Sequence, residues 1–93
     1  MNTQKEGVEK MSKILAGPVW AMAVVEIDGK FFAAIANKNE WGDDYTPEEW
    51  AACRKAELPT ELVGEAISEM RAISEDRHAE APVMNLYTGY AVR

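Results

Sequence analysis

The sequence predicts an α+β fold in which a small antiparallel sheet packs against about three helices, in the order α-β-β-α-α-β. Three observations predict it. Residues 19–37 are rich in β-branched and aromatic side chains and are interrupted once, by Asp28-Gly29. Residues 60–77 carry apolar side chains at the helical spacing of three and four. Residues 83–92 alternate in part, as a strand does. A chain of 93 residues is expected to form one domain, residues 1–93.

The first expected element is a helix within residues 3–16. Gly17 is a typical helix stop, and Pro18 prevents the helix from resuming. Four apolar side chains share one face of this helix: Val8, Met11, Ile14 and Leu15.

Residues 19–27 and 30–37 are expected to pair as a β-hairpin, because Asp28-Gly29 favours a two-residue type I′ turn. Such a turn places Val25 opposite Phe32 and Val24 opposite Ala33. Both faces of this hairpin are apolar, whereas a half-exposed antiparallel sheet alternates apolar with polar residues. A helix of this chain, a second subunit or a partner must therefore cover the bulkier face. That face is a candidate homodimer surface, formed by Trp20, Met22, Val24, Phe31 and Ile35.

A second helix is expected over residues 46–57. Thr46 can cap it, Pro47 suits the first helical position, and Glu49 completes a capping box. Leu58-Pro59 breaks this helix, and Thr60 is expected to cap a third helix that ends near residue 77. The third helix has a continuous apolar stripe: Leu62, Val63, Ala66, Ile67, Met70 and Ile73. A C-terminal strand, residues 83–92, is expected to complete the sheet.

The net charge of −6 is concentrated in residues 39–70, which hold nine acidic and two basic residues. A surface of one sign attracts partners of the other sign. Binding to nucleic-acid phosphates requires clustered lysine and arginine, so direct nucleic-acid binding is not expected. The chain has one cysteine and no apolar run of membrane-spanning length, and its first ten residues lack the apolar core of a signal peptide. We therefore expect a cytoplasmic protein, in the host cell if it is phage-encoded, with no membrane contact.

Residues that could perform chemistry are sparse. One cysteine, Cys53, and one histidine, His78, cannot form a closed zinc site. Asp43 and Asp44 lack the alternating ligand pattern of a calcium loop. The glycines are scattered and form no phosphate-binding loop. The sequence predicts no enzyme, no metal and no cofactor.

Two groups of residues are candidates for binding a partner protein. The first, which we call the acidic-aromatic segment, spans residues 40–49: Glu40, Trp41, Asp43, Asp44, Tyr45, Glu48 and Glu49. Aromatic side chains anchor interfaces, and carboxylates meet arginine and lysine across them. The second, the glutamate stripe, repeats every four residues on the third helix: Glu61, Glu65 and Glu69. The alternative interpretation is structural: the acids cap helices or face solvent, and the aromatic rings hold a loop on the core.

In size, charge and clustered acids the chain resembles phage-encoded anti-defence inhibitors such as anti-CRISPR proteins, although no motif carries family residues over. This resemblance implies an inhibitor that docks on a basic, nucleic-acid-binding surface of a partner protein, where its acidic side chains replace the phosphate charges. An immunity protein or antitoxin that neutralises a cognate toxin remains an alternative, as does a homodimeric assembly protein without catalysis.

Overall fold

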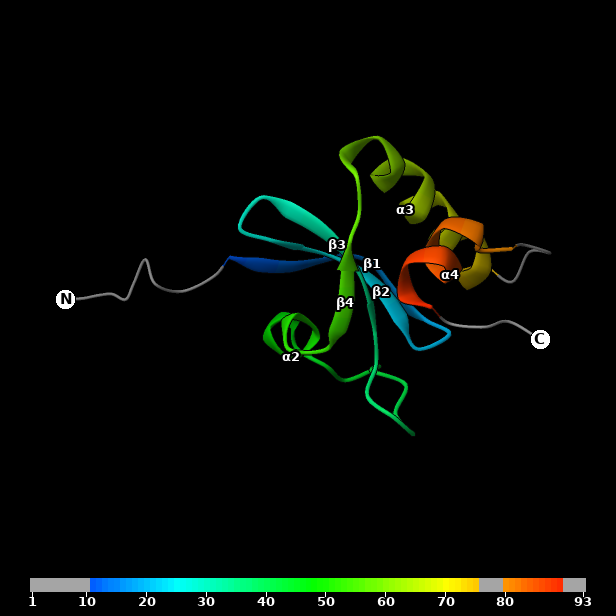
Figure 1. Ribbon diagram of the computed structural model, residues 1–93. Coiled ribbons are helices and arrows are strands. Elements are labelled where there is room, and N and C mark those ends of the chain that lie inside the picture. Colours follow the sequence, from blue (N-terminus) through cyan, green and yellow to red (C-terminus); the bar gives the residue numbers. More distant parts are fainter. Residues whose placement is uncertain (1–10, 76–79, 90–93) are drawn as a thin grey trace.

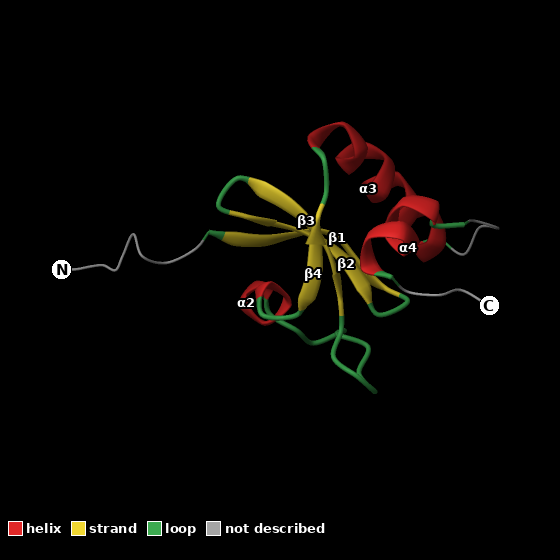
Figure 2. Ribbon diagram, viewed as in Figure 1, coloured by secondary structure: helices red, strands yellow, loops and turns green. Residues whose placement is uncertain are grey.

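The computed structural model describes residues 11–75 and 80–89 of the chain. In chain order the elements are β1 (Ser12–Val19), β2 (Met22–Ile27), β3 (Lys30–Ile35), α2 (Pro47–Ala51), β4 (Arg54–Glu57), α3 (Thr60–Ser74) and α4 (Pro82–Thr88), as Figure 1 shows. The strands form one antiparallel sheet in the order β1-β2-β3-β4. Figure 2 shows α2 apart from α3 and α4, and the core contacts place them on opposite faces of the sheet.

The mixed α+β content agrees with the sequence prediction, but the predicted order α-β-β-α-α-β is wrong. In the described part of the chain, three strands come first, and the sheet gains its fourth strand from β4 rather than from the C-terminus. The three corrections concern residues 12–19, 54–57 and 83–88.

Residues 12–19, predicted as helix, form β1. Ile14 packs on the α2 side of the sheet, whereas its neighbour Leu15 packs on the α3 side. Adjacent apolar residues that pack on opposite faces favour a strand, because successive side chains of a strand point opposite ways, whereas those of a helix are only about 100° apart. Gly17 adopts φ +93°, and a Cβ there would lie 2.8 Å from the carbonyl oxygen of Met22, so β1 and β2 approach closely at this point. Residues 3–10 of the predicted helix lie outside the described residues.

The hairpin of β2 and β3 confirms the predicted register, with Val25 opposite Phe32 and Val24 opposite Ala33. Asp28 and Gly29 have φ of +53° and +84°, the left-handed values that a type I′ turn requires. β2 begins at Met22 rather than at residue 19, because a second tight turn at Trp20-Ala21 joins β1 to β2.

Both faces of the hairpin are covered by helices of the same chain. Met22 and Val24 are 0% exposed in a cluster with Met70 of α3 and Met84 of α4. On the other face, the small side chains of β2 and β3 pack with Trp50 of α2. The candidate homodimer face is therefore corrected. Met22 and Val24 lie within the cluster that includes α3 and α4, and Phe31 packs against that cluster. Trp20, in the turn between β1 and β2, and Ile35, the last residue of β3, lie near one end of the sheet.

Residues 46–57, predicted as a single helix, form a short helix, α2, followed by the strand β4. The capping box of Thr46 and Glu49 is present, with Pro47 in the first turn. The chain leaves the helix after Ala51, and Arg54–Glu57 pairs with β3. Pairing with β4 satisfies backbone groups at the edge of β3 that a longer helix would have left without a partner.

α3 confirms the predicted long helix over its described residues, and its buried positions are Val63, Ala66, Met70 and Ile73. The predicted Thr60 cap is wrong, because Pro59 occupies the cap position and no side chain caps the helix.

The predicted strand at residues 83–92 is also wrong where the structure describes it. Residues 82–88 form α4, which starts with Pro82 and is followed by its C-cap residue Gly89, with φ +70°. Met84 and Thr88, four residues apart, point into the core, so a helical rather than an alternating pattern buries this segment. Residues 90–92 lie outside the described residues.

Candidate protein-binding surface

The acidic-aromatic segment and the glutamate stripe lie on opposite faces of the sheet. The segment leads into α2, which packs with Ala23, Val25 and Ala34, whereas α3 packs with Met22 and Val24 (Figure 1). Consecutive residues of a strand face opposite ways. The two predicted groups therefore do not form one continuous docking surface.

The acidic-aromatic segment is held on the core through Trp50, which is 0% exposed. Gly42 lies directly on the indole: a Cβ at this position would be 2.7 Å from Cη2 of Trp50. The ring of Tyr45 packs on the same indole, with 4.9 Å between the ring centroids. The loop before α2 is therefore fixed by two contacts to one buried ring.

Tyr45 also fixes the start of the segment by hydrogen bonds. Its hydroxyl accepts a bond of 3.2 Å from the backbone N–H of Asn37 and donates one to the carboxylate of Glu40. The hydrogen bond to Glu40, and then burial, raises the pKa of Tyr45 above its ordinary value, so the phenol keeps its proton to a higher pH than a free tyrosine does. Of the predicted binding residues, Glu40 and Tyr45 thus contact each other within the chain.

Two more of the predicted binding residues cap helices. The carboxylate of Glu49 accepts a bond of 2.7 Å from the backbone N–H of Thr46. The carboxylate of Glu69 accepts bonds of 2.9 Å and 3.0 Å from the backbone N–H groups of Val83 and Met84, at the start of α4. An acidic acceptor at a helix N-terminus is favourable for both hydrogen bonding and the helix dipole. The last member of the glutamate stripe is therefore explained by structure.

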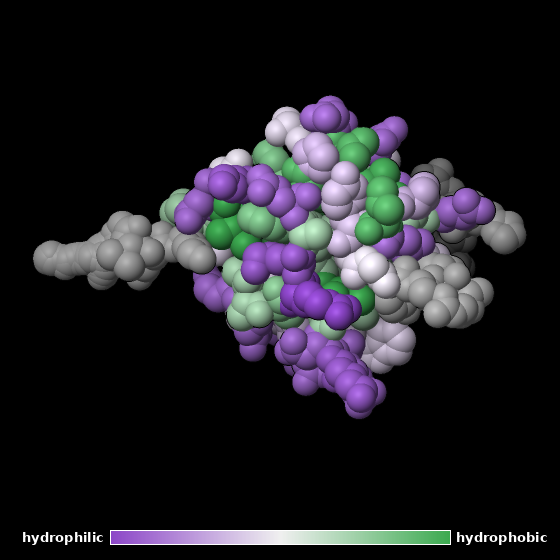
Figure 3. Space-filling model, viewed as in Figure 1, coloured by the Kyte–Doolittle hydropathy of each residue, from purple (hydrophilic) through white to green (hydrophobic). Residues whose placement is uncertain are grey.

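The remaining predicted residues project from the surface. Trp41 is 65% exposed. The side chains of five predicted acidic residues make no hydrogen bond or ion pair with another described residue: Asp43, Asp44, Glu48, Glu61 and Glu65. Figure 3 shows hydrophilic atoms over the end of the molecule where the loop after β3 lies in Figure 1.

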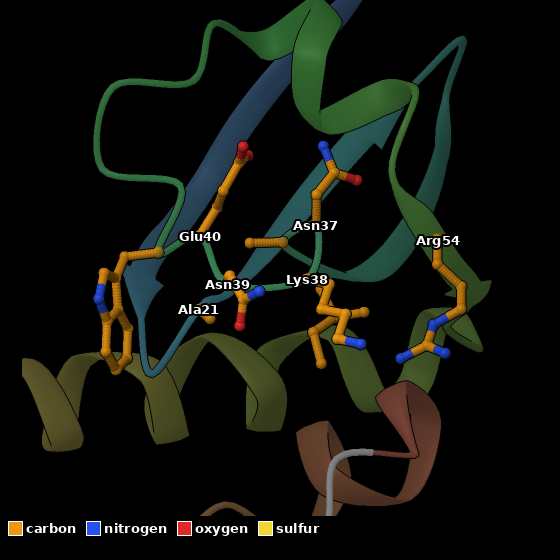
Figure 4. A pocket seen from close by; sticks show the side chains of 9 residues that line it. Ala21, Asn37, Lys38, Asn39, Glu40 and Arg54 are labelled. Carbon is orange, nitrogen blue, oxygen red and sulfur yellow. The ribbon is translucent and has the colours of Figure 1, made fainter.

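Two hollows adjoin Trp41. The first, the acidic hollow, has a volume of about 660 Å³ and is lined by Glu40, Trp41, Gly42, Asp43, Asp44, Tyr45 and Glu49. The second, the end groove, has a volume of about 800 Å³ and is shown in Figure 4. Its lining residues are Ala21, Ile35, Ala36, Asn37, Lys38, Asn39, Glu40, Trp41 and Arg54. Trp41 and Glu40 line both hollows, so Trp41 stands between a site of negative charge and a site that includes two cations.

Sequence reasoning did not identify the end groove. Arg54 reaches it only because β4 pairs with β3, which places Arg54 opposite Ile35. The sequence predicted a helix there. Lys38, between two asparagines just after β3, is the one local signal that the sequence offers.

The groups capable of chemistry are few in the described part of the chain. The Cys53 thiol is buried and donates a bond of 3.2 Å to the carbonyl of Glu49. Burial raises its pKa, which disfavours the reactive thiolate. No group of three or more potential metal ligands occurs among residues 11–75 and 80–89. His78 lies outside them.

No protein-family model, curated protein or solved structure matches this chain. In the described residues, no helix is long and apolar enough to cross a membrane.

Proposed function

We propose that this protein is a small inhibitor that docks through its acidic-aromatic segment on a basic, nucleic-acid-binding surface of a partner protein. The observation that carries the proposal is the side chain of Trp41, 65% exposed on a loop that is itself held on the buried Trp50. Exposed large aromatic residues on an ordered backbone are typical anchors of protein interfaces.

The charge around Trp41 supports a basic partner. Asp43, Asp44 and Glu48 hold no intramolecular partner among the described residues, and residues 39–49 contain no lysine or arginine. Carboxylates placed in this way complement arginine and lysine side chains that bind phosphates in the absence of the inhibitor.

The order of the loop also supports docking. Because Gly42 and Tyr45 contact Trp50, the loop is arranged before a partner arrives. Binding then costs less conformational entropy than it would for a free loop. We narrow the proposed contact to the acidic-aromatic segment, since Glu61 and Glu65 lie on α3 across the sheet.

The test is affinity capture from a lysate of the source cells, at low and high salt, with the full chain as bait. We expect a basic nucleic-acid-binding protein to be retained at low salt and released by salt or by added nucleic acid. Retention should fall at least about tenfold in Trp41→Ala and in the double variant Asp43→Asn/Asp44→Asn, as expected for hot-spot and charge-pair losses of more than 1.4 kcal/mol.

The matched control is Glu61→Gln/Glu65→Gln, which removes the same number of charges from the opposite face. Equal loss of retention in this control would mean that net charge, rather than the loop, attracts the partner, and the proposal would fail. Capture of a toxin in place of a nucleic-acid-binding protein would favour an immunity protein or antitoxin.

A further inference from the structure

The end groove combines apolar and cationic side chains at one end of the sheet. Ala21, Ile35 and Ala36 contribute its apolar side chains, and Trp41 contributes an exposed indole. The groove lies where β3 ends, beside the tight turn that joins β1 to β2. A shallow apolar surface next to an exposed indole suits one apolar side chain of a partner.

The backbone around the groove is constrained. Trp20 and Ala21 adopt φ of +54° and +60°, although neither is glycine. Ala21 is held to the sheet by its carbonyl, which accepts a bond of 2.8 Å from the N–H of Ala36. Left-handed backbone at two successive non-glycine residues is uncommon and costs free energy, and such strain often accompanies functional positions.

The two basic side chains of the groove and its one acidic side chain point in different directions. In Figure 4 the side chains of Lys38 and Arg54 extend toward the lower part of the view, whereas Glu40 extends toward the upper part. The Glu40 carboxylate accepts the hydrogen bond of Tyr45. Neither Lys38 nor Arg54 has an ion-pair partner among the described residues. The groove therefore offers two available cations, together with the amide groups of Asn37 and Asn39.

We propose that the end groove binds a segment of the partner protein in which an aspartate or glutamate follows an apolar residue. The apolar side chain lies on Ile35 and Ala36 against Trp41, and the carboxylate pairs with Arg54 and Lys38. Arginine is well suited to this role, because its guanidinium can bind a carboxylate with two parallel hydrogen bonds.

This inference rests on the proposed function, because Trp41 borders both hollows. It adds that the docking site on the partner is not uniformly basic. Basic residues of the partner meet Asp43 and Asp44 on one side of Trp41, and a carboxylate meets Lys38 and Arg54 on the other. A phosphate could also pair with the two cations, but Asp43 and Asp44 close to Trp41 would repel the following phosphates of a nucleic acid.

The test is a titration of the ¹⁵N-labelled full chain, followed by the shifts of its backbone amide resonances. The probes are acetyl-Ala-Leu-Asp-Ala-amide, the same peptide with lysine in place of aspartate, the same peptide with alanine in place of leucine, and a thymidine hexanucleotide. We expect the Leu-Asp peptide to shift the amides of Asn37, Lys38 and Arg54. The two altered peptides should bind the groove about tenfold more weakly, because each lacks one of the two anchors.

Two charge variants locate the binding. Lys38→Gln/Arg54→Gln should weaken the Leu-Asp peptide about tenfold, as loss of a charged hydrogen-bond pair does. The matched control, Lys13→Gln/Lys30→Gln, removes two exposed lysines of β1 and β3 and should leave its affinity unchanged.

The inference is overturned if the Leu-Asp peptide shifts none of these amides, if the lysine peptide binds the groove as well, or if the oligonucleotide binds it more tightly. Its failure is distinguishable from failure of the proposed function. The lysine peptide should instead shift the amides of Asp43 and Asp44, and Asp43→Asn/Asp44→Asn should remove that effect while leaving the Leu-Asp peptide bound.

Discussion

Gly42 is the residue at which the backbone of the acidic-aromatic segment touches the core. Its φ of +82° lies in the left-handed region, and its missing side chain leaves room for the indole of Trp50. No other residue type meets both requirements without strain. The position of Trp41, one residue earlier, therefore depends on a glycine.

We predict that Gly42→Ala destabilises the protein by about 1–3 kcal/mol, because the new methyl group overlaps Trp50 and the backbone is left-handed. The matched control is Gly64→Ala in α3, where a Cβ meets nothing within 4 Å and φ is not positive. That change should stabilise the protein by about 0.5–1 kcal/mol, since alanine favours a helix. Urea unfolding of both variants measures the difference. A neutral Gly42→Ala would contradict the close contact.

Cys53 and Tyr45 make a residue-scale prediction about pH. The pKa of each is raised in the folded state, by burial for Cys53 and by the hydrogen bond to Glu40 for Tyr45. The unfolded chain therefore releases these protons at lower pH than the folded chain does, and folding stability falls as pH rises above the ordinary values of 9.0 and 10.0. Urea unfolding from pH 8 to 11 should show a shallower decline in Cys53→Ala and in Tyr45→Phe. Parallel curves for wild type and both variants would exclude this assignment.

At the scale of the element, Glu69 joins α3 to α4. Its spacing with Glu61 and Glu65 predicts a solvent-facing glutamate. In the structure, however, its carboxylate accepts hydrogen bonds from the backbone N–H groups of Val83 and Met84. α4 has only seven residues and no capping side chain at its own N-cap position, Ala81. A short helix depends on tertiary contacts, so the neighbouring element supplies the acceptor.

We predict that Glu69→Ala destabilises the protein by about 1–2 kcal/mol, the usual cost of losing a helix cap. Glu65→Ala, one turn earlier on α3, should change stability by less than about 0.5 kcal/mol. Thermal unfolding measures both, and hydrogen exchange at Val83 and Met84 should accelerate only in Glu69→Ala. If both variants behaved alike, the capping role would be excluded.

The elements that the sequence predicted correctly are those governed by local rules. Asp28-Gly29 determines its own turn and thereby the register of β2 and β3. Thr46-Pro47 with Glu49 determines where α2 starts. The elements that were wrong depend on distant partners: residues 12–19 become a strand beside β2, and residues 54–57 become a strand beside β3. The local sequence pattern of a segment does not show that a distant strand has an unpaired edge with which the segment can pair.

At the scale of the whole molecule, the sheet is covered on both faces and blunted at both edges. β1 is interrupted by register shifts between Ile14 and Val19, and β4 is four residues long with two cations. Irregular, short and charged edges discourage pairing with other strands. The exposed Trp41 and its two hollows therefore remain the most distinctive docking feature of the described surface.

The candidate site was predictable only in part. The acidic and aromatic residue types of 40–49 are visible in the sequence, and so is their interleaving. Which of them face a partner was only partly visible: the capping role of Glu49 was predicted, but the hydrogen bond between Tyr45 and Glu40 forms only when the chain folds. On α3, the contact of Glu69 with α4 was likewise not visible. The end groove was missed because Arg54 arrives on a strand that the sequence predicted as helix.

The amino-acid sequence by itself determined the charge of the molecule, the hairpin turn, the start of α2 and the apolar stripe of α3. Each of these depends on residues within a few positions of one another. Tertiary structure alone decided that α2 and α3 cover opposite faces, which separates the two acidic groups, and that Lys38, Arg54 and Trp41 line one groove. The physical reason is that a strand or helix with apolar residues on its surface takes its final place from the partner that buries them.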